Sequence, residues 1–261
     1  MSKAKKRGII LLSIFIGVIL AASLTFYFVF DVKSWQKLDA SKLTTLAQTS
    51  TLYDRQENII TTLKGSENRT LVAIDDIPLH TQQAFIAAED VRFYEHSGID
   101  VYRIFGALRS NLQSGSLAEG ASTITQQLAK LTHLSSEKTL RRKLEEIYLA
   151  FQIERTYSKN EILSMYLNTV YFGRGAYGIQ AAAQAYFGID AKDLTVAQSA
   201  CLAAIIKAPS VYAPHISPES NKNRRNYILN VMYENDFISF SAMKDAQSES
   251  LWVIAQRDEP Q

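Results

Sequence analysis

The sequence predicts an all-α domain that follows an N-terminal membrane anchor and a short β-hairpin. Of the 261 residues, 47% are hydrophobic, which is enough to bury one sizeable core. From Ile77 onward, apolar residues recur at helical spacing between residues that commonly cap helices. The stretch from Gly8 to Phe30, by contrast, carries no charge. Together these observations place a helical domain behind a hydrophobic segment.

The uncharged segment 8–30 has the length and the flanks of a transmembrane helix. At about 1.5 Å per residue it can span the roughly 30 Å hydrocarbon core of a bilayer. Four Lys and Arg residues precede it within residues 1–7, so the positive-inside rule leaves that tail in the cytoplasm and the rest of the chain outside. A cleaved signal peptide is the alternative, although its apolar region usually spans only about 7–15 residues.

Residues 31–69 are expected to form a stalk and a hairpin. Residues 31–45 are mostly polar and predict a short stalk. The runs STLYD at 50–54 and NIITTL at 58–63 are rich in β-branched residues and flank turn-forming residues, which predicts two paired strands.

The helical domain is expected over residues 70–236, with residues 237–261 as a C-terminal tail. Asp100 can cap a helix whose apolar residues keep helical spacing until it ends near Ser114. Another start is predicted at Ser217, because the proline that follows it suits the first helical position. Three capping boxes mark further starts: Thr123 with Gln126, Ser158 with Glu161, and Thr195 with Gln198.

The charge balance and the cysteine count exclude several classes of function. The net charge is +2, and the first seven residues hold four positive charges, so the remainder carries a net charge of −2. The basic character therefore comes from the anchor and does not support nucleic-acid binding. With the single cysteine Cys201 and four scattered histidines, neither an internal disulfide nor a zinc cluster is supported. We expect no organic cofactor.

The stretch GASTITQQLAK, residues 120–130, has two interpretations. In the structural one, glycine loosens the entry to a helix and the capping box closes it. In the functional one, the free N–H groups of the helix N-terminus, followed by Lys130, form an anion site. The first turn holds more hydroxyl and amide side chains than capping requires, namely Ser122, Thr123, Thr125, Gln126 and Gln127.

The next predicted helix, within residues 135–155, presents two rows of side chains. One row is apolar: Leu140, Leu144, Ile147, Tyr148 and Phe151. The other begins charged and becomes apolar, so we expect the later turns to be covered on both sides: Arg142, Glu146, Leu149 and Ile153. Glu146 is either half of a surface ion pair with Arg142 or a carboxylate at the floor of a cleft. The cations that would rim this cleft and neutralise a phosphate-rich ligand are Lys130, Lys138, Arg142 and Lys143.

Two further motifs need an explanation. AAEDVRFYEHSG, residues 87–98, places Glu89 and Asp90 where an apolar helix ends; taken alone, such a pair is simply a solvated helix end. YFGRGAYG, residues 171–178, contains G-x-G-x-x-G, but no parallel sheet is predicted around it, so tight turns between helices are expected instead of a dinucleotide site.

Taken in order, the motifs resemble the peptidoglycan glycosyltransferases, which occur as half of class A penicillin-binding proteins and as stand-alone membrane-anchored enzymes. The resemblance covers about residues 70–235 and rests on AAEDVRFYEHSGID, GASTITQQLAK, RRKLEE, SKNEILSMYLNTVYFGRGAYGIQAAAQAYFG and LTVAQSACLAA. It implies a lysozyme-like fold with a large helical lobe and a smaller lobe against the membrane of a bacterial cell. A stand-alone enzyme and a shortened bifunctional protein both remain open.

The resemblance also implies residue roles. Glu89 takes the place of the catalytic carboxylate and Glu146 that of the second acidic residue. Contacts to the donor phosphates or sugar fall to Ser122, Thr123, Gln126, Gln127, Lys130, Lys138, Arg142 and Lys143. Scaffold positions of the first motif are Asp90, Phe93, His96 and Gly98. The chain departs from the family pattern at Gln198 and Asp236, where a glutamate and a turn glycine are usual.

The implied reaction joins lipid II to a growing glycan chain on the same undecaprenyl-pyrophosphate carrier. Glu89 would take a proton from the acceptor sugar, and the cationic rim or a divalent cation such as Mg²⁺ or Mn²⁺ would neutralise the leaving pyrophosphate. Expected partners are the membrane and a transpeptidase or other cell-wall synthesis protein, with no nucleic acid. The alternatives are a lytic enzyme on the same fold and an inactive scaffold.

Overall fold

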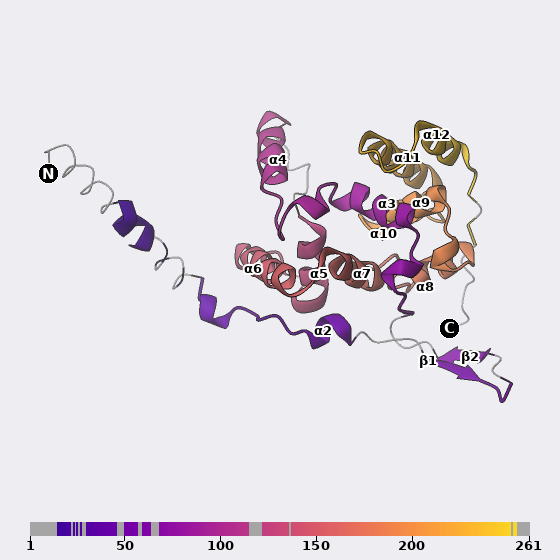
Figure 1. Cartoon of the computed structure of the whole chain (residues 1–261), viewed down its shortest axis with the longest axis horizontal. Coiled ribbons are helices and arrows are strands. Elements are labelled where there is room, and N and C mark those ends of the chain that lie inside the picture. Colours follow the sequence, from indigo (N-terminus) through magenta and orange to yellow (C-terminus); the bar gives the residue numbers. More distant parts are fainter. Residues whose placement is uncertain are drawn as a thin grey trace, which may run out of the picture.

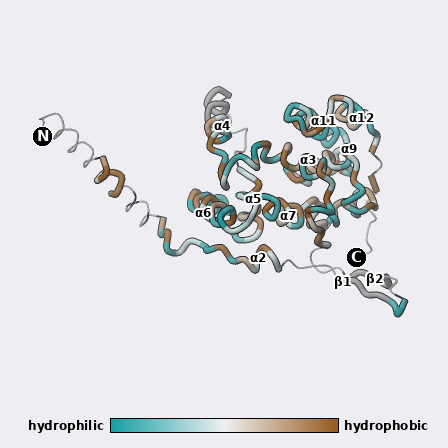
Figure 2. The backbone as a smooth tube through the Cα atoms, in the orientation of Figure 1, coloured by the Kyte–Doolittle hydropathy of each residue, from teal (hydrophilic) through white to brown (hydrophobic). Residues whose placement is uncertain are grey.

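The computed structural model describes residues 15–21, 23, 25, 27, 30–45, 50–56, 59–63, 68–114, 122–135, 137–251 and 253–254 (Figure 1). Part of the predicted anchor, residues 8–30, lies outside these ranges. Within them, no helix is both long and apolar enough to cross a membrane. Residues 15–20 form a helical stretch that is hydrophobic (Figure 2), with exposed side chains such as Phe15.

Helices dominate the described residues, which confirms the mostly helical class (Figure 1). The first elements are η1 (Val32–Ser34), α2 (Ser41–Thr44), β1 (Ser50–Tyr53), β2 (Ile59–Leu63), η2 (Ile74–Asp76), α3 (Leu79–Glu89), η3 (Phe93–Glu95) and α4 (Val101–Ser114). Then follow α5 (Ile124–His133), α6 (Leu140–Thr156), α7 (Lys159–Thr169), α8 (Ile179–Phe187), η4 (Ala191–Asp193), α9 (Val196–Ile205), α10 (Pro209–Tyr212), α11 (Pro218–Glu234) and α12 (Phe240–Ser248).

The local signals in the sequence are confirmed. Strand β1 pairs with β2 in antiparallel register, so the hairpin forms, with a bulge at Leu52 and Tyr53. All three capping boxes have both of their hydrogen bonds, at the starts of α5, α7 and α9. The carboxylate of Asp100 accepts the N–H of Arg103 at 2.9 Å and so caps α4. These contacts join residues that are close in the sequence, which explains why the sequence was sufficient to predict them.

The core gathers around α9, which packs against α3 and α11. Most of its side chains, Ala197 and Ser199 to Ile205, are buried. A helix that is apolar on nearly all sides needs partners on all sides, and α10 and α12 supply the remaining ones. The segment expected to be a C-terminal tail thus contains helix α12, which buries Met243 and Ala246 against the domain.

The glycines of residues 171–178 make tight turns between α7 and α8, as expected. Gly173, Gly175 and Gly178 all have positive φ. At Gly178 an added Cβ would lie 2.8 Å from the carbonyl oxygen of Asn168, so any side chain there would collide with the backbone at the end of α7.

The expectation that the later turns of α6 are covered on both sides is wrong. Leu149 and Ile153 are fully buried, but Tyr148 and Phe151 are 37% and 41% exposed. The reason is that α6 packs mainly on α5 and less on α7, which cover the row that includes Leu149 and Ile153. In the apolar row beginning at Leu140, Leu144 and Ile147 are only half-buried and the other residues are exposed.

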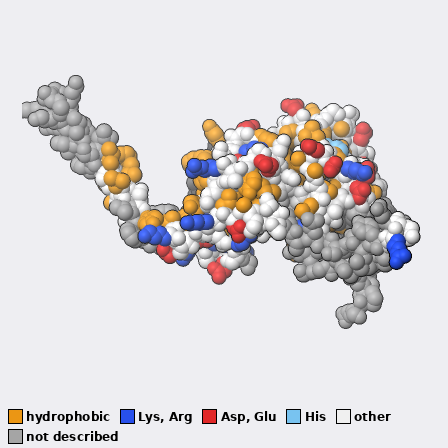
Figure 3. Space-filling model, turned by 60° about the horizontal axis from the view of Figure 1, so that its bottom comes forward, with side chains coloured by type: hydrophobic (Ala, Val, Ile, Leu, Met, Phe, Trp, Pro, Cys, Tyr) orange, Lys and Arg blue, Asp and Glu red, His pale blue; other side chains and the backbone are white. Residues whose placement is uncertain are grey.

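The stalk, residues 31–45, is docked on the domain despite its polar composition. Leu43 belongs to the hydrophobic core, and the ring of Trp35 meets Tyr148 of α6 edge-on at 5.6 Å. The backbone N–H of Asp39 donates to Nε2 of His133 at the end of α5, at 3.0 Å. In Figure 3, hydrophobic side chains lie among Lys and Arg side chains where the stalk meets the domain. The stalk therefore connects directly to the two helices, α5 and α6, that carry most of the predicted site residues.

Candidate active site

A cleft of about 810 Å³ opens where α3 ends, between α4, α5 and α11. Four of the predicted site residues line it: Glu89, Ser122, Gln127 and Lys130. The charged residues that line it and were not predicted are Arg92, Asp100, Arg103, Lys207 and Arg224. Residues 87–90 at the end of α3 lie on the cleft wall, so Glu89 and Asp90 do not form a simple solvated helix end.

Glu89 is held in place by a neutral partner. It is the last residue of α3, two positions after the buried run from Ala84 to Ala87, so its backbone is fixed by the core. The side-chain amide of Gln127, from the first turn of α5, donates to Oε2 of Glu89 at 2.6 Å. The carboxylate therefore contacts the cleft while one of its oxygens is bound.

Burial raises the pKa of Glu89 above the ordinary glutamate value. The hydrogen bond from Gln127 opposes this rise, as do the positive charges of Arg224, Arg103 and Lys207. A partly desolvated carboxylate with a raised pKa is a better proton acceptor than an exposed one, which suits a general base.

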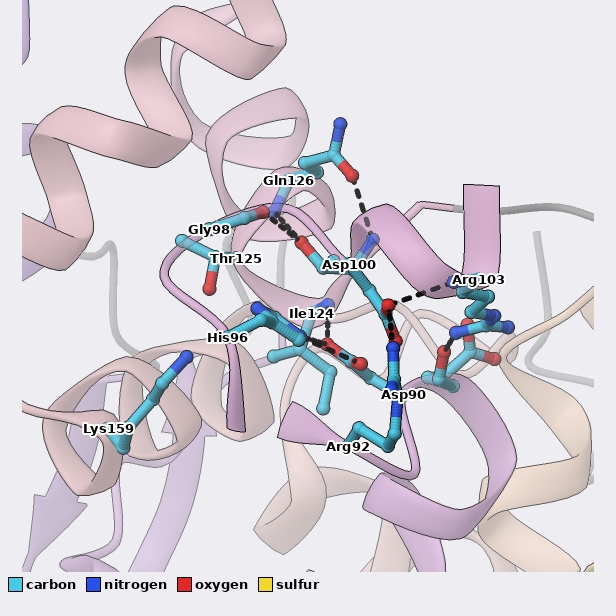
Figure 4. Close-up of polar contacts among 12 residues, drawn as sticks. Asp90, Arg92, His96, Gly98, Asp100, Arg103, Ile124, Thr125, Gln126 and Lys159 are labelled. Atoms are coloured by element: carbon cyan, nitrogen blue, oxygen red, sulfur yellow. Dashed lines mark hydrogen bonds and ion pairs between the residues drawn. The ribbon is translucent and has the colours of Figure 1, made fainter. Parts of the chain in front are cut away.

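Arg103 ties the end of α3 to α4 (Figure 4). Its guanidinium donates to the backbone carbonyl oxygen of Glu89, while its own N–H is accepted by Asp100. Asp100 is in turn paired with Arg92, whose Nε donates to it at 3.1 Å, and the Arg92 charge helps to hold the pKa of Asp100 below its usual value. Asp100 thus accepts hydrogen bonds from two arginines of the cleft wall, from the side chain of Arg92 and from the backbone N–H of Arg103.

Asp90 joins α3 to the start of α5 (Figure 4). Its carboxylate is buried, lies 3.0 Å from Nε2 of His96, and accepts the N–H of Ile124 at 3.0 Å. A negative charge at a helix N-terminus is favourable, so Asp90 fixes α5 relative to α3. Gln127 is thereby placed beside Glu89.

Thr123, Gln126 and Thr125 are engaged in the scaffold. Thr123 and Gln126 are buried and form the capping box, and the hydroxyl of Thr123 also donates to the carbonyl of Gly98 at 2.6 Å. The hydroxyl of Thr125 donates to Glu154 at 2.6 Å, next to the ion pair of Glu154 with Lys159. In the described residues these three side chains are not part of the cleft lining.

Glu146 lies inside the domain and binds two cations. It is 2% exposed, and Arg142 donates to its Oε2 at 2.9 Å while Lys143 pairs with its other oxygen. The ammonium of Lys143 also donates to the hydroxyl of Ser122 at 2.8 Å, and Ser122 lines the cleft. Glu146 is therefore connected to the cleft through Lys143 and Ser122 and does not form its floor.

The predicted rim of four cations is divided between two places. Lys130 lines the cleft, whereas Arg142 and Lys143 are occupied by Glu146, and Lys138 is exposed ahead of α6. The cleft has other cations in Arg103, Lys207 and Arg224. They follow no fixed spacing in the sequence, since they come from α4, from the chain after α9 and from α11, so only the tertiary structure could reveal them.

Comparisons with known proteins agree with one another. A family model described as transglycosylase matches residues 55–233. Penicillin-binding protein 1A/1B of Bacillus subtilis (strain 168) is 45% identical over 98% of this chain and 27% of its own length. Penicillin-binding protein 1F of the same organism is 46% identical over 82% of this chain and 30% of its own. The chain thus spans about three tenths or less of these relatives.

A solved structure, penicillin-binding protein 1A from Haemophilus influenzae, matches with a TM-score of 0.47 and 23% identity, over 82% of this chain and 22% of that one.

Proposed function

This chain belongs to the transglycosylase family, and we propose that it polymerises lipid II into the β-1,4-linked glycan strands of peptidoglycan. The donor would be the growing chain on undecaprenyl pyrophosphate, and transfer to the 4-hydroxyl of the acceptor would invert the anomeric carbon. The observation that carries this proposal is Glu89, a carboxylate with a raised pKa in a cleft lined by cations.

Glu89 would act as the general base. As the acceptor hydroxyl attacks the anomeric carbon of the donor, the carboxylate takes the hydroxyl proton, and the bond from that carbon to the pyrophosphate breaks. Gln127 holds the carboxylate in one orientation. Arg103 fixes the backbone from which it projects.

The leaving pyrophosphate is already an anion, so it needs positive charge more than a proton. Lys130 of α5 would supply this charge together with Arg103, Lys207 and Arg224. Ser122, Lys143 and Arg142 would support this edge of the site through Glu146. We propose a smaller contribution to donor binding from Lys138, which lies just before the start of α6, and from the capping residues Thr123 and Gln126.

In the part of the chain that the structure describes, the cleft offers no ready set of ligands for a resident divalent cation. The carboxylates that line it there are Glu89, Asp90 and Asp100. Asp90 is already bound by His96 and by the backbone of α5, and Asp100 by the side chain of Arg92 and the backbone N–H of Arg103. Among the described residues, no group of three or more potential acidic, histidine or cysteine ligands is arranged to hold a metal. Mg²⁺ or Mn²⁺ carried by the pyrophosphate would arrive as part of the substrate.

The same proposal covers the organisation of the chain. Residues 8–30 would anchor it in a bacterial cell membrane, with residues 1–7 in the cytoplasm and a two-lobed, lysozyme-like domain over 70–236 outside. Because its relatives are named as penicillin-binding proteins, we propose that it works with a transpeptidase or another cell-wall synthesis protein.

The test is gel analysis of the purified full chain with labelled lipid II, with and without a phosphoglycolipid inhibitor. We expect inhibitor-sensitive growth of glycan polymer and none from Glu89→Gln. Release of soluble glycan from purified sacculi, without polymer from lipid II, would indicate a lytic enzyme instead. A correctly folded wild-type chain that does neither would indicate an inactive scaffold.

A further inference from the structure

A buried tyrosine lies behind the amide that holds Glu89. Tyr166 of α7 is fully buried, and its hydroxyl donates to Oε1 of Gln127 at 3.4 Å. The amide nitrogen of the same Gln127 donates to Oε2 of Glu89 at 2.6 Å. The three residues therefore form a chain of hydrogen bonds that runs from Tyr166 of α7 through Gln127 of α5 to Glu89 of α3, the proposed base.

The Gln127 amide contacts a hydrogen-bond acceptor, Glu89, on one side and a donor, Tyr166, on the other. A side-chain amide has an oxygen that accepts and a nitrogen that donates, and a carboxylate only accepts. The nitrogen must therefore face Glu89, and the oxygen then faces the Tyr166 hydroxyl. Burial raises the pKa of Tyr166 well above its ordinary value, and the charges of Glu89 and Asp90 add to the rise, so this hydroxyl keeps its proton and remains a donor.

We infer that Tyr166 is a positioning residue for the polymerisation proposed above. Acting through Gln127, it keeps the amide N–H on Oε2 of Glu89 and leaves Oε1 to accept the proton of the sugar hydroxyl. Among the described residues, Oε1 has no hydrogen-bond partner in the protein. The inference rests on the proposed function for its chemistry, but the geometry stands independently of it.

Loss of the tyrosine hydroxyl has a defined electrostatic consequence. The amide becomes free to rotate, so the N–H leaves Oε2 for part of the time, or the amide oxygen meets the carboxylate. Either change weakens the bond that opposes the effect of burial, and the pKa of Glu89 rises further. Since the base works deprotonated, the acid limb of kcat/KM must move to higher pH.

The experiment compares Tyr166→Phe with Tyr186→Phe in the full chain. Tyr186 is also fully buried, and its hydroxyl donates to the carbonyl of Phe172 at 2.8 Å, away from the cleft lining. We expect the acid limb to move upward by about one pH unit in Tyr166→Phe and to stay in place in Tyr186→Phe. An unmoved limb in a Tyr166→Phe protein that melts near the wild type would overturn the inference.

A second variant tests whether the effect passes through the amide. Gln127→Met keeps the length of the side chain but removes both hydrogen bonds, so it should move the limb in the same direction even if Tyr166→Phe fails to fold. In the Gln127→Met background, adding Tyr166→Phe should move the limb no further. An unmoved limb in Gln127→Met, or a further shift in the double variant, would show that Tyr166 does not act through Gln127.

An observation without substrate separates this inference from the proposed function. In protein labelled with ¹³C at the glutamate carboxyls, the Glu89 signal is the one missing from Glu89→Gln, and its titration midpoint should be higher in Tyr166→Phe than in the wild type. A wild type that makes no polymer would refute the proposed function while this titration still tests the geometry. An equal midpoint in the two folded proteins would refute the inference even if polymer forms.

Discussion

The C-terminal end of α3 and the middle of α6 each place a carboxylate inside the domain, but in opposite settings. Glu89 contacts the cleft and is bound by the neutral amide of Gln127, with three cations acting on it through space. Glu146 is 2% exposed and is bound directly by Arg142 and Lys143. One carboxylate can exchange a proton without breaking an ion pair, and the other cannot.

This difference indicates a chemical role for Glu89 and a structural role for Glu146. A base must change its charge during turnover, so a neutral partner and a raised pKa suit Glu89. A buried carboxylate with two direct cations fixes their positions instead, and removal of one partner leaves charge without compensation. Through Lys143, Glu146 also determines where the hydroxyl of Ser122 lies at the cleft edge.

The largest effect should follow from Glu89→Gln. The variant keeps the size of the side chain and removes the base, and loss of a general base typically lowers the rate about 10²–10⁴-fold. Polymerisation of labelled lipid II should fall by at least this factor while the melting temperature does not drop. A variant that folds and polymerises at near wild-type rate would remove Glu89 from the mechanism.

The next effect concerns Lys130, the one predicted rim cation that lines the cleft. Lys130→Ala should lower kcat about 10²-fold, because a single charged donor at a developing anion can be worth this much. Its side chain is exposed, so the melting temperature should stay within the small range typical of surface substitutions. Lys192, exposed in η4 away from the cleft, is the matched control: Lys192→Ala should retain full activity. Equal activity of the two variants would place the anion site elsewhere.

Glu146→Gln should reverse the pattern, with more effect on stability than on rate. It removes the negative charge that Arg142 and Lys143 share, and hydrogen bonds to a charged group are worth about 2 kcal/mol. Both cations keep some access to water, at 16% and 38% exposure, which limits the loss. Denaturant unfolding should show a clear decrease in the free energy of unfolding. If stability is unchanged and polymerisation is abolished as in Glu89→Gln, then Glu146 takes part in the chemistry directly.

Local contacts explain which parts of the fold the sequence could predict. The hairpin, the Asp100 cap and the three capping boxes each depend on residues within a short span of chain, and all of them form. The docking of the stalk through Leu43 and the surface position of Tyr148 were missed. The first depends on the packing of α2 on α5, and the second on which face of α6 its neighbours cover. Periodicity along one segment does not contain that information.

The site shows the same division. Glu89, Gln127 and Lys130 were predicted from motifs and do meet in the cleft. The motif order could not show that the side chains of Thr123 and Gln126 bind each other's backbone in the capping box and do not line the described part of the cleft. Nor could it show that Arg224 and Arg103 face Glu89, because these arginines lie on α11 and α4, which only the folded core brings together.

The smallest predicted effect is the change in the pH dependence of stability when Glu89 is replaced. Burial raises the pKa of Glu89 in the folded chain above its value in the unfolded chain. The folded state therefore holds this proton more tightly, and the stability it contributes is present at low pH and is lost as the pH rises through the folded pKa. In Glu89→Gln this loss cannot occur. We therefore expect the melting temperature of Glu89→Gln minus that of the wild type to become more positive between pH ~4 and ~8.

Glu146→Gln provides the comparison for that measurement. Its stability relative to the wild type reflects the missing ion pair with Arg142 and Lys143, so the gain seen with Glu89→Gln at higher pH should be absent. If Glu89→Gln loses stability relative to the wild type as the pH rises, the cations of the cleft outweigh burial at Glu89. The carboxylate would then be stabilised in its charged form, and the contrast between the end of α3 and the middle of α6 would disappear.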